Sequence, residues 1–354
     1  MKKIILTGGG TAGHVTPNIA LLPKLRELGY DIEYIGSYKG MEKELIEKEG
    51  IPYHGIASGK LRRYIDIKNL TDPFRVIHGL RQSLTLLRKL KPDVIFSKGG
   101  FVSVPVVLAA HRLHIPAIIH ESDMTPGLAN KICFSSATKI CCNFPETMKY
   151  LPADKRVLTG SPIRDELMHG DKDHAYEITG FTPDKPVIMV IGGSLGSVAV
   201  NTLVRNCLPK LLKEYQVLHI CGRGNIDESL SGTEGYKQYA YVSDDLKDFF
   251  ALADVVISRA GANVICELLT IHKPNILIPL GTAGSRGDQI LNARSFEAQG
   301  FSTVILEEEA TEKKLLAAIK NTYENREDLS ARMEASQLDE GIDNVIKLIT
   351  ELTK

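Results

Sequence analysis

The chain has 354 residues, and its 43 basic residues balance its 43 acidic residues to a net charge of zero. This length allows two domains with a core each, and a composition of 43% hydrophobic and 24% charged residues is typical of a soluble globular protein. No apolar run approaches the roughly 18 residues that span a bilayer, and the short apolar run after Lys3 does not predict an export signal. The six cysteines show no CxxC or zinc spacing, so we expect buried, reduced thiols in a cytosolic protein.

The charge is divided unevenly along the chain. Residues 1–160 hold 23 of the basic and 14 of the acidic residues, so the first half is basic and the second half is acidic. The excess of positive charge predicts that the first half meets an anionic partner, which on charge alone is either a membrane surface or nucleic acid.

Short apolar segments alternate with periodic helical segments from the start of the chain. In the first half, the pattern predicts strands at 3–6, 32–35, 53–56, 94–97, 117–120, 139–142 and 157–158, with helices at 17–28, 41–49 and 74–90. After a polar break at 161–186, it predicts strands at 187–191, 216–221, 238–241, 255–258, 275–278 and 302–305, with helices at 198–212, 246–251, 264–269, 288–298, 312–323 and 342–352. Such alternation predicts an α/β protein with two doubly wound parallel sheets joined by a linker.

A glycine-rich turn, TGGGTAGHVTP from Thr7 to Pro17, joins the first predicted strand to the first predicted helix. Its glycines match GxGxxG, a pattern in which backbone amides at a helix start bind a diphosphate. The dinucleotide fingerprint also needs an acid at the end of the second strand, but Gly36 and Ser37 stand there, which argues against NAD. His14 would face the resulting pocket; the alternative is that it caps the helix or packs against it.

The stretch from residue 60 to residue 91 combines cations with apolar residues. Its cations include Arg62, Arg63, Arg75, Arg81, Arg88, Lys89 and Lys91. One interpretation is a core helix with a solvated charged face, and the other is a surface that rests on anionic lipid headgroups. Aromatic residues that would stack on bases are sparse here, which makes nucleic acid the weaker alternative.

Further candidate residues follow predicted strands, at the sheet edge where open α/β folds bind ligands. In the first half these are KGGF at 98–101 and HESD at 120–123. In the second half, the glycine loop at 192–197 contains Ser194, which can bond a phosphate and cap the next helix. The helix after SRAGA (258–262) carries Glu267, which is either a ligand for a ribose diol or an ordinary surface residue, and GTAGSRGDQ (281–289) forms another such loop.

One short motif points to a different chemistry. Asp171, Lys172 and Asp173 spell DxD, a motif that binds a metal and a sugar nucleotide in some glycosyltransferases. The motif lies in the polar break rather than at the end of a strand, so we interpret it as solvated charge.

In this order, the segments GGGTAGHVTPN, KGGFVSVP, HESDMTPGLANK, GSPIR, GGSLGS, SRAGANVICE and GDQILNA resemble the MurG family, the N-acetylglucosaminyltransferases that complete lipid II in bacterial cell-wall synthesis. The resemblance covers nearly the whole chain. It implies a GT-B fold, in which two Rossmann-like doubly wound domains face each other across a cleft. Residues 1–163 would bind the acceptor lipid I and the membrane, residues 164–340 would bind UDP-N-acetylglucosamine (UDP-GlcNAc), and residues 341–354 would form a helix that crosses back to the first domain.

The resemblance also implies the residues of the site. The catalytic base would be His14, with Asp123 and Glu121 as alternatives. The substrate-binding residues would be Thr11, Ala12 and Gly13 at the diphosphates, Arg164 and Ser194 at the nucleotide, Val242 or Ser243 at the uracil, Ala262, Asn263, Val264, Ile265, Cys266 and Glu267 along the diphosphate and ribose, and Gln289, next to Asp288, at the sugar hydroxyls. No metal or other cofactor would be required.

The sequence departs from the usual family pattern at three places. Ala12 and Gly13 replace a pair of glycines, Glu121-Ser122-Asp123 replaces Glu-Gln-Asn, and Asp288-Gln289 replaces a pair of glutamines. These changes leave the exact contacts to the donor sugar open.

The implied reaction is inverting transfer of N-acetylglucosamine from UDP-GlcNAc to the muramoyl C4 hydroxyl of lipid I. The enzyme would be peripheral at the cytoplasmic face of the cell membrane, with an anionic membrane surface and no nucleic acid among its partners. Two alternatives share the fold: a UDP-GlcNAc 2-epimerase, which needs no lipid-facing surface, and a diacylglycerol glycosyltransferase. A third is a non-catalytic or NAD-binding Rossmann protein, which the missing ribose acid disfavours.

Overall fold

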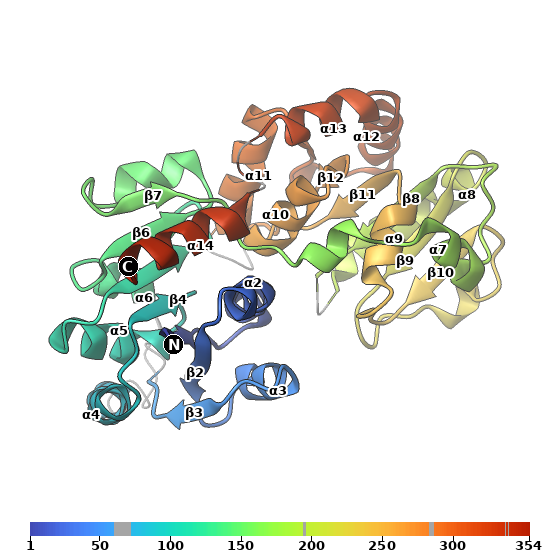
Figure 1. Ribbon diagram of the computed structural model, residues 1–354. Helices are drawn as coiled ribbons and strands as arrows, with labels where there is room; N and C mark the ends of the chain where they lie inside the picture. The colour runs from blue at the N-terminus through green and yellow to red at the C-terminus, as the bar shows by residue number, and fades with distance from the viewer. Residues whose placement is uncertain (60–71, 194–195, 283–286, 337, 339) are drawn as a thin grey trace. The chain divides into compact units, whose positions relative to one another are not determined.

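The computed structural model describes residues 1–59, 72–193, 196–282, 287–336, 338 and 340–354. It divides into two compact units: the first comprises Met1–Arg164 and Glu340–Lys354, and the second comprises Asp165–Asp339. Each unit is built on one parallel sheet with helices beside it (Figure 1).

The first unit contains a seven-stranded sheet in the order β3-β2-β1-β4-β5-β6-β7. Its strands are β1 (Lys3–Thr7), β2 (Asp31–Ser37), β3 (Tyr53–Ile56), β4 (Val94–Ser97), β5 (Ala117–Glu121), β6 (Lys139–Cys142) and β7 (Arg156–Leu158). Its helices are η1 (Ala12–His14), α1 (Thr16–Ala20), α2 (Leu22–Glu27), α3 (Met41–Lys48), α4 (Asp72–Leu90), α5 (Ser103–Arg112), α6 (Leu128–Cys133), η3 (Pro145–Tyr150) and α14 (Gly341–Leu352). The strands β2 and β3 are added on one side of β1, and β4 and the strands after it are added on the other side. The carboxyl ends of β1 and β4 therefore form a topological switch point.

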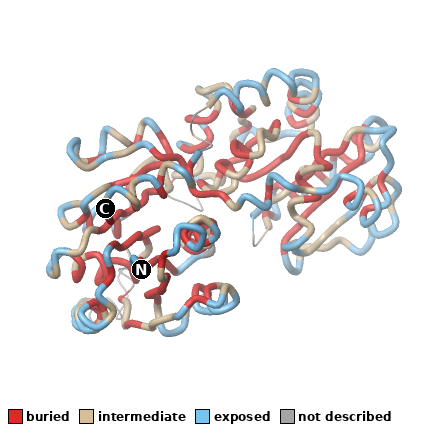
Figure 2. Tube along the Cα trace, viewed as in Figure 1, coloured by how far each residue is buried: buried red, intermediate tan, exposed pale blue. Residues whose placement is uncertain are grey.

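Both faces of this sheet are buried, as the period-2 geometry of a strand requires when helices cover both sides. Ile4 and Leu6 of β1 belong to one apolar cluster, and Ile5 between them belongs to the other. The last helix, α14, completes the first cluster with Val345 and Ile349, which are fully buried. Figure 2 shows the result: the strands in the middle of the sheet are buried, whereas the edge strand β7 and the helices carry exposed residues.

The second unit contains a six-stranded sheet in the order β10-β9-β8-β11-β12-β13, with its switch point between β8 and β11. Its strands are β8 (Val187–Ile191), β9 (Gln216–Ile220), β10 (Tyr236–Tyr239), β11 (Val255–Ser258), β12 (Asn275–Leu277) and β13 (Thr303–Val304). Its helices are η4 (Asp165–Met168), α7 (Lys172–Thr179), α8 (Val198–Leu211), η5 (Glu228–Leu230), α9 (Leu246–Leu252), α10 (Ala262–Thr270), α11 (Asp288–Ala298), η6 (Glu307–Glu309), α12 (Glu312–Glu324) and α13 (Arg326–Glu334).

One predicted helix was wrong. The single helix predicted at 17–28 is two helices that meet at Leu21, because Pro23 has no N–H to donate to the Ile19 carbonyl. The stretch at 161–186, predicted as a polar linker, contains the helices η4 and α7. Asp171 caps α7 by accepting hydrogen bonds from the backbone amides of Asp173 and His174, at 2.9 and 3.1 Å. The first acid of the DxD motif is therefore a helix cap.

Two further observations bear on the predicted class of protein. All six cysteines are buried and form no disulfide. Within the described ranges, no helix combines the length and the apolar character needed to cross a bilayer.

Candidate active site

The first glycine-rich loop follows β1 and leads through η1 into α1. Its underside is held by two buried side chains: the Tyr34 hydroxyl donates to the Gly8 carbonyl at 2.8 Å, and Asn18 Nδ2 donates to the His14 carbonyl at 3.3 Å. A side chain at Gly8 would collide with that same His14 carbonyl, so the close turn requires glycine here. These contacts fix the backbone that carries His14.

The His14 imidazole is neutral at physiological pH. Its Nδ1 lies 3.1 Å from the Thr11 hydroxyl. Burial, reinforced by the positive charge of Lys98, lowers the pKa of His14 to about 4, while the Gly9 backbone and the Glu42 carboxylate act in the opposite direction. A neutral ring has a nitrogen lone pair that can accept a proton, which a general base needs.

The loop after β4 meets the first glycine loop at the switch point. A methyl group added at Gly99 would lie 3.7 Å from His14 Cδ2 and 3.4 Å from Asn130 Oδ1. Asn130 in turn donates to Glu121 Oε2 at 2.9 Å. The KGGF segment therefore lies next to His14, and the HESD segment is linked to it through Asn130.

Glu121, one of the alternative bases, is enclosed by its own loop. Its carboxylate accepts hydrogen bonds from the backbone amides of Asp123 (3.1 Å) and Gly127 (2.9 Å) and from the Asn130 side chain. Burial raises its pKa, although these hydrogen bonds oppose the shift. Glu121 thus organises the start of α6, whereas Asp123 is half-buried and stands beyond the end of β5.

A buried lysine lies beside these residues. Lys98 is 1% exposed, and its Nζ donates to His120 Nδ1 at 2.7 Å. His120 Nε2 then donates to the Gly160 carbonyl at 2.9 Å, which fixes the neutral tautomer. Burial, together with Lys98, holds the pKa of His120 well below its usual value. Lys98 therefore places an enclosed positive charge near His14 and His120.

The predicted residues of the second unit lie beyond the carboxyl ends of its strands. Val242 and Ser243 stand between β10 and α9, and residues 262–267 form most of α10, after β11. Within α10, Ala262, Ile265 and Cys266 are buried in the core, while Asn263, Val264 and Glu267 are half-buried. Asp288 and Gln289 begin α11, and the Gln289 side-chain oxygen accepts a hydrogen bond from the Leu280 amide at 3.0 Å. Ser194 lies outside the described residues.

One buried arginine, whose role the sequence analysis missed, cross-links the loops at this edge. Arg259 donates to the Ser197 hydroxyl and to Glu307 Oε1, both at 2.6 Å, and to the Ile278 carbonyl at 3.1 Å. Glu307 Oε2 also accepts from the Gly281 amide at 3.0 Å. Burial acts to raise the pKa of Glu307, but these hydrogen bonds outweigh it and the pKa is lowered. The loops after β8, β11 and β12 are thereby held together.

Arg164, predicted to contact the nucleotide, is the last residue of the first unit before η4. It is half-buried and follows the buried Ile163.

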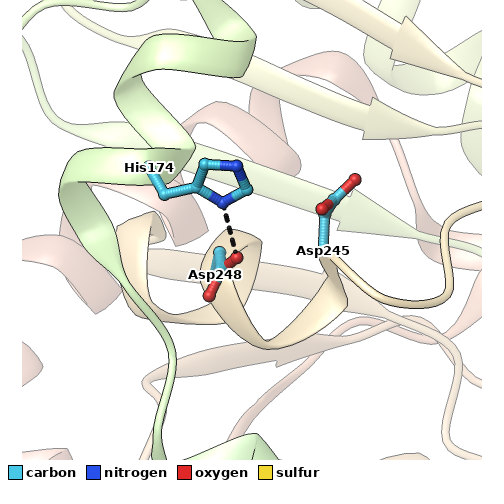
Figure 3. Close-up of side chains that lie close together, drawn as sticks. All are labelled: His174, Asp245 and Asp248. Atoms are coloured by element: carbon cyan, nitrogen blue, oxygen red, sulfur yellow. Dashed lines mark hydrogen bonds and ion pairs between the residues drawn. The ribbon is translucent and has the colours of Figure 1, made fainter.

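Three potential metal ligands of the second unit lie close together (Figure 3). One ligand atom each from His174, Asp245 and Asp248 falls within 4.8 Å of the others. His174 Nδ1 and Asp248 Oδ2 lie 2.9 Å apart, and Asp248 Oδ1 accepts from the Asp171 amide at 2.7 Å. These two hydrogen bonds account for the positions of His174 and Asp248 without requiring an ion.

We expect the His174–Asp248 pair to stabilise the second unit over a limited pH range. The hydrogen bond to Asp248 raises the pKa of His174 above 6.5, so its contribution is complete below pH 6.5 and is lost as the pH rises through the raised pKa. Burial acts to raise the pKa of Asp248, but hydrogen bonds from Asp171 and His174 outweigh it and lower the pKa below 3.8; that contribution is lost on acidification. The free energy of unfolding, measured by urea titration, should therefore differ most between wild type and His174→Asn near pH 5.

His169→Asn is the matched control, because its partner Asp165 is also an aspartate but both side chains are at least 66% exposed. Its effect on the free energy of unfolding should vary less with pH. An effect of His174→Asn that is equal at pH 5 and pH 8.5 would contradict the assignment.

Comparison with known proteins adds the family. Residues 4–142 match the glycosyltransferase family 28 N-terminal domain, and residues 187–349 match the glycosyltransferase family 28 C-terminal domain. The chain is 62% identical over 354 residues to the UDP-N-acetylglucosamine--N-acetylmuramyl-(pentapeptide) pyrophosphoryl-undecaprenol N-acetylglucosamine transferase of Lachnospira eligens, and the alignment covers 100% of both chains.

Solved structures agree on the fold. MurG of Acinetobacter baumannii is similar with a TM-score of 0.78 and 25% identity, over 99% of this chain and 100% of that chain. A putative UDP-N-acetylglucosamine 2-epimerase from Listeria monocytogenes has a TM-score of 0.72 at 13% identity, over 99% of this chain and 96% of that chain. At that identity the likeness shows the fold alone.

Proposed function

The chain belongs to glycosyltransferase family 28 and has the GT-B fold of two Rossmann-like domains, and from this membership we propose its reaction. It is a hexosyltransferase that moves N-acetylglucosamine from UDP-GlcNAc to the muramoyl C4 hydroxyl of lipid I, with inversion, and so forms lipid II. The single observation that carries this function is the 62% identity to the L. eligens enzyme over the whole length of both chains.

In the proposed reaction the acceptor oxygen attacks C1 of the donor sugar. The bond from C1 to the β-phosphate oxygen breaks, its electron pair leaves with UDP, and the acceptor proton passes to a base. We assign the base to His14, which is neutral at pH 7 and lies at the switch point of the first unit. The backbone amides at the start of α10 and the guanidinium of Arg164 would stabilise the negative charge on the departing UDP.

The two units divide the substrates in this proposal. The first would bind lipid I, with Thr11, Ala12 and Gly13 near its diphosphate. The second would bind UDP-GlcNAc, with Val242 or Ser243 at the uracil, residues 262–266 along the diphosphate, Glu267 at the ribose and Gln289 at the sugar. Because the polyprenyl chain of lipid I stays in the bilayer, we also propose that the enzyme is peripheral at the cytoplasmic membrane face. Its basic first unit would rest there on anionic lipid, and no nucleic acid is involved.

The decisive experiment is transfer of labelled N-acetylglucosamine from UDP-GlcNAc to lipid I. Lipid II is the expected product. Epimerised UDP-sugar without transfer would identify the 2-epimerase alternative, and glycolipid made on diacylglycerol would identify the other.

Glu267→Ala should weaken UDP-GlcNAc binding while the fold survives. Its carboxylate would accept hydrogen bonds from the ribose hydroxyls, and losing a charged acceptor costs about 1.5–3 kcal/mol. Calorimetry on the variant checks this. Glu297→Ala serves as the control, since that glutamate is an exposed residue of α11 paired with Arg294; donor affinity unchanged in both variants would remove Glu267 from the site.

We propose that the reaction needs no metal, and expect transfer to continue in excess EDTA. The departing UDP would be stabilised by the Arg164 guanidinium and by helix amides rather than by a metal ion. A metal-dependent glycosyltransferase assayed in the same buffer controls for chelation. If activity falls and Mg²⁺ or Mn²⁺ restores it, the cluster of His174, Asp245 and Asp248 becomes the first place to look.

A further inference from the structure

A fully buried carboxylate sits under the first glycine-rich loop. Glu42 lies in the first turn of α3, yet its side chain is 0% exposed. A carboxylate at such a position usually points to solvent, where it interacts favourably with the helix dipole. This one turns inward, towards the carboxyl ends of β1 and β2.

The Glu42 carboxylate joins the end of β2 to the loop after β1. Its Oε1 accepts hydrogen bonds from the Ser37 amide at 3.1 Å and from the Ser37 hydroxyl at 2.5 Å. Its Oε2 accepts a longer hydrogen bond, 3.4 Å, from the Gly10 amide. Gly10 belongs to the turn that a GxGxxG pattern assigns to a bound diphosphate.

Glycines enclose this carboxylate. A methyl group added at Gly9 would lie 2.6 Å from Glu42 Oε1, and its three nearest atoms all belong to Glu42. A side chain at Gly40 would collide with the carboxylate, whereas one at Gly36 would collide first with the Tyr53 hydroxyl and would lie 3.0 Å from Glu42 Cγ. None of these three glycines has a positive φ, so they are required for space and not for backbone conformation.

We propose that Glu42 is an internal anion seated in the first glycine-rich loop, and that it is a positioning residue for His14. A second anion at the Gly10 amide would be repelled by a buried charge in contact with it. The acceptor diphosphate would therefore bind farther along the loop, at Thr11 to Gly13. The amide of Gly10 would remain hydrogen-bonded to Glu42.

The contacts around His14 give Glu42 a path to the reaction. Gly9, which packs on the carboxylate, also hydrogen-bonds the His14 side chain through its backbone. Two charged groups act on the imidazole: Lys98, from the end of β4, opposes its protonation, and Glu42, from α3, favours it. Glu42 thus helps to position His14. Its negative charge would also stabilise the imidazolium that forms during transfer.

The inference rests on the proposed function, and a double-mutant cycle on Gly9→Ala and Glu42→Ala tests it. If the glycine exists to make room for the carboxylate, Gly9→Ala should lower kcat between about 10- and 100-fold in the wild-type background, by displacing the loop, but change it by less than about twofold in the Glu42→Ala background. If the glycine exists for close approach of a ligand, the two effects should multiply. That result would overturn the proposal.

A second comparison separates positioning from stability. Glu42→Gln keeps the shape of the side chain but loses the charge and turns an amide donor towards Gly10 or Ser37, so kcat should fall while donor affinity, measured by calorimetry, stays the same. The control is Glu33→Gln, a buried carboxylate of β2 that pairs with Lys3 and His54. It should lower the urea midpoint and leave kcat within about twofold. Wild-type kcat in Glu42→Gln would contradict the proposal.

The cycle is also measured on the urea midpoint, which needs no substrate. Coupling between Gly9 and Glu42 in the urea midpoint would support the seating of the carboxylate even if the wild-type protein made no lipid II. The absence of lipid II would reject the proposed function instead. Additive shifts in the midpoint would reject the seating itself.

Discussion

His14→Ala should reduce turnover on lipid I by on the order of 10²–10⁴-fold, the usual contribution of a general base. Donor affinity should change little, because the residues proposed to bind UDP-GlcNAc, apart from Arg164, belong to the second unit. The measurement is kcat together with the dissociation constant for UDP-GlcNAc, since loss of folding would affect both.

Asp123→Asn is the companion variant. It removes the charge of the alternative base and keeps its size. If His14→Ala retains near-normal turnover and Asp123→Asn loses it, the base is Asp123. Glu121 is less informative in such a test, because its removal would release the three hydrogen bonds that organise residues 123–130.

Four substitutions on α4 should reduce binding to anionic vesicles by on the order of 10³-fold. The exposed face of this helix presents Arg75, Arg81, Arg88 and Lys89, together with Ile77, which is 50% exposed. Each cation near an anionic surface contributes about 1 kcal/mol, within a Debye length of roughly 8 Å. Changing all four to Ser should therefore lower the fraction of protein that sediments with vesicles that contain anionic lipid. Binding of the variant should also depend less on salt than binding of the wild type does.

The matched control removes four cations from the second unit instead. Lys313, Lys314 and Lys320 lie on α12 and Arg326 begins α13, so their substitution by Ser changes the net charge equally. Activity of the α4 variant on a soluble short-chain acceptor should remain near wild type. Equal loss of vesicle binding in both variants would mean that net charge, and not this surface, attracts the protein. Arg62 and Arg63, predicted to join the surface, lie outside the described residues.

The family and the fold could be predicted from the sequence, and both are confirmed. The central strands were found because they are short apolar runs buried on both faces, such as Val94–Ser97. Helices were harder where local signals compete. The pair α1 and α2 was predicted as one helix because its apolar spacing continues across Pro23, and α7 was missed because its exposed, polar face dominates its sequence.

The candidate site could be predicted only in part. Glycine loops and polar residues after strands can be recognised in the sequence as candidates for a site, because the topology of a parallel sheet brings strand ends to one edge. Contacts between distant segments carry no such signal. Glu307 lies 48 residues after Arg259 in the sequence, and Glu42 resembles any acid in a first helical turn. Their burial depends on how the loops pack in three dimensions, which periodicity does not contain.

Because of helix α14, the two units can complete their folds only at different times during synthesis. It packs its buried Val345, Ile346 and Ile349 on the first sheet, its Asn344 side chain donates to the Thr159 carbonyl at 3.2 Å, and Thr353 hydrogen-bonds Tyr30 at 2.6 Å. The ribosome delivers these residues only after it has made the entire second unit, which is continuous in the chain.

The first unit must therefore wait, with the part of its apolar sheet face that α14 covers left open, until the second unit has emerged and had time to fold. A fragment that ends at Arg164 should expose this face and aggregate, whereas the same fragment with residues 340–354 joined through a flexible linker should be soluble. The second unit alone should need no such repair. Translation thus imposes an order of assembly in which the part made first is finished last.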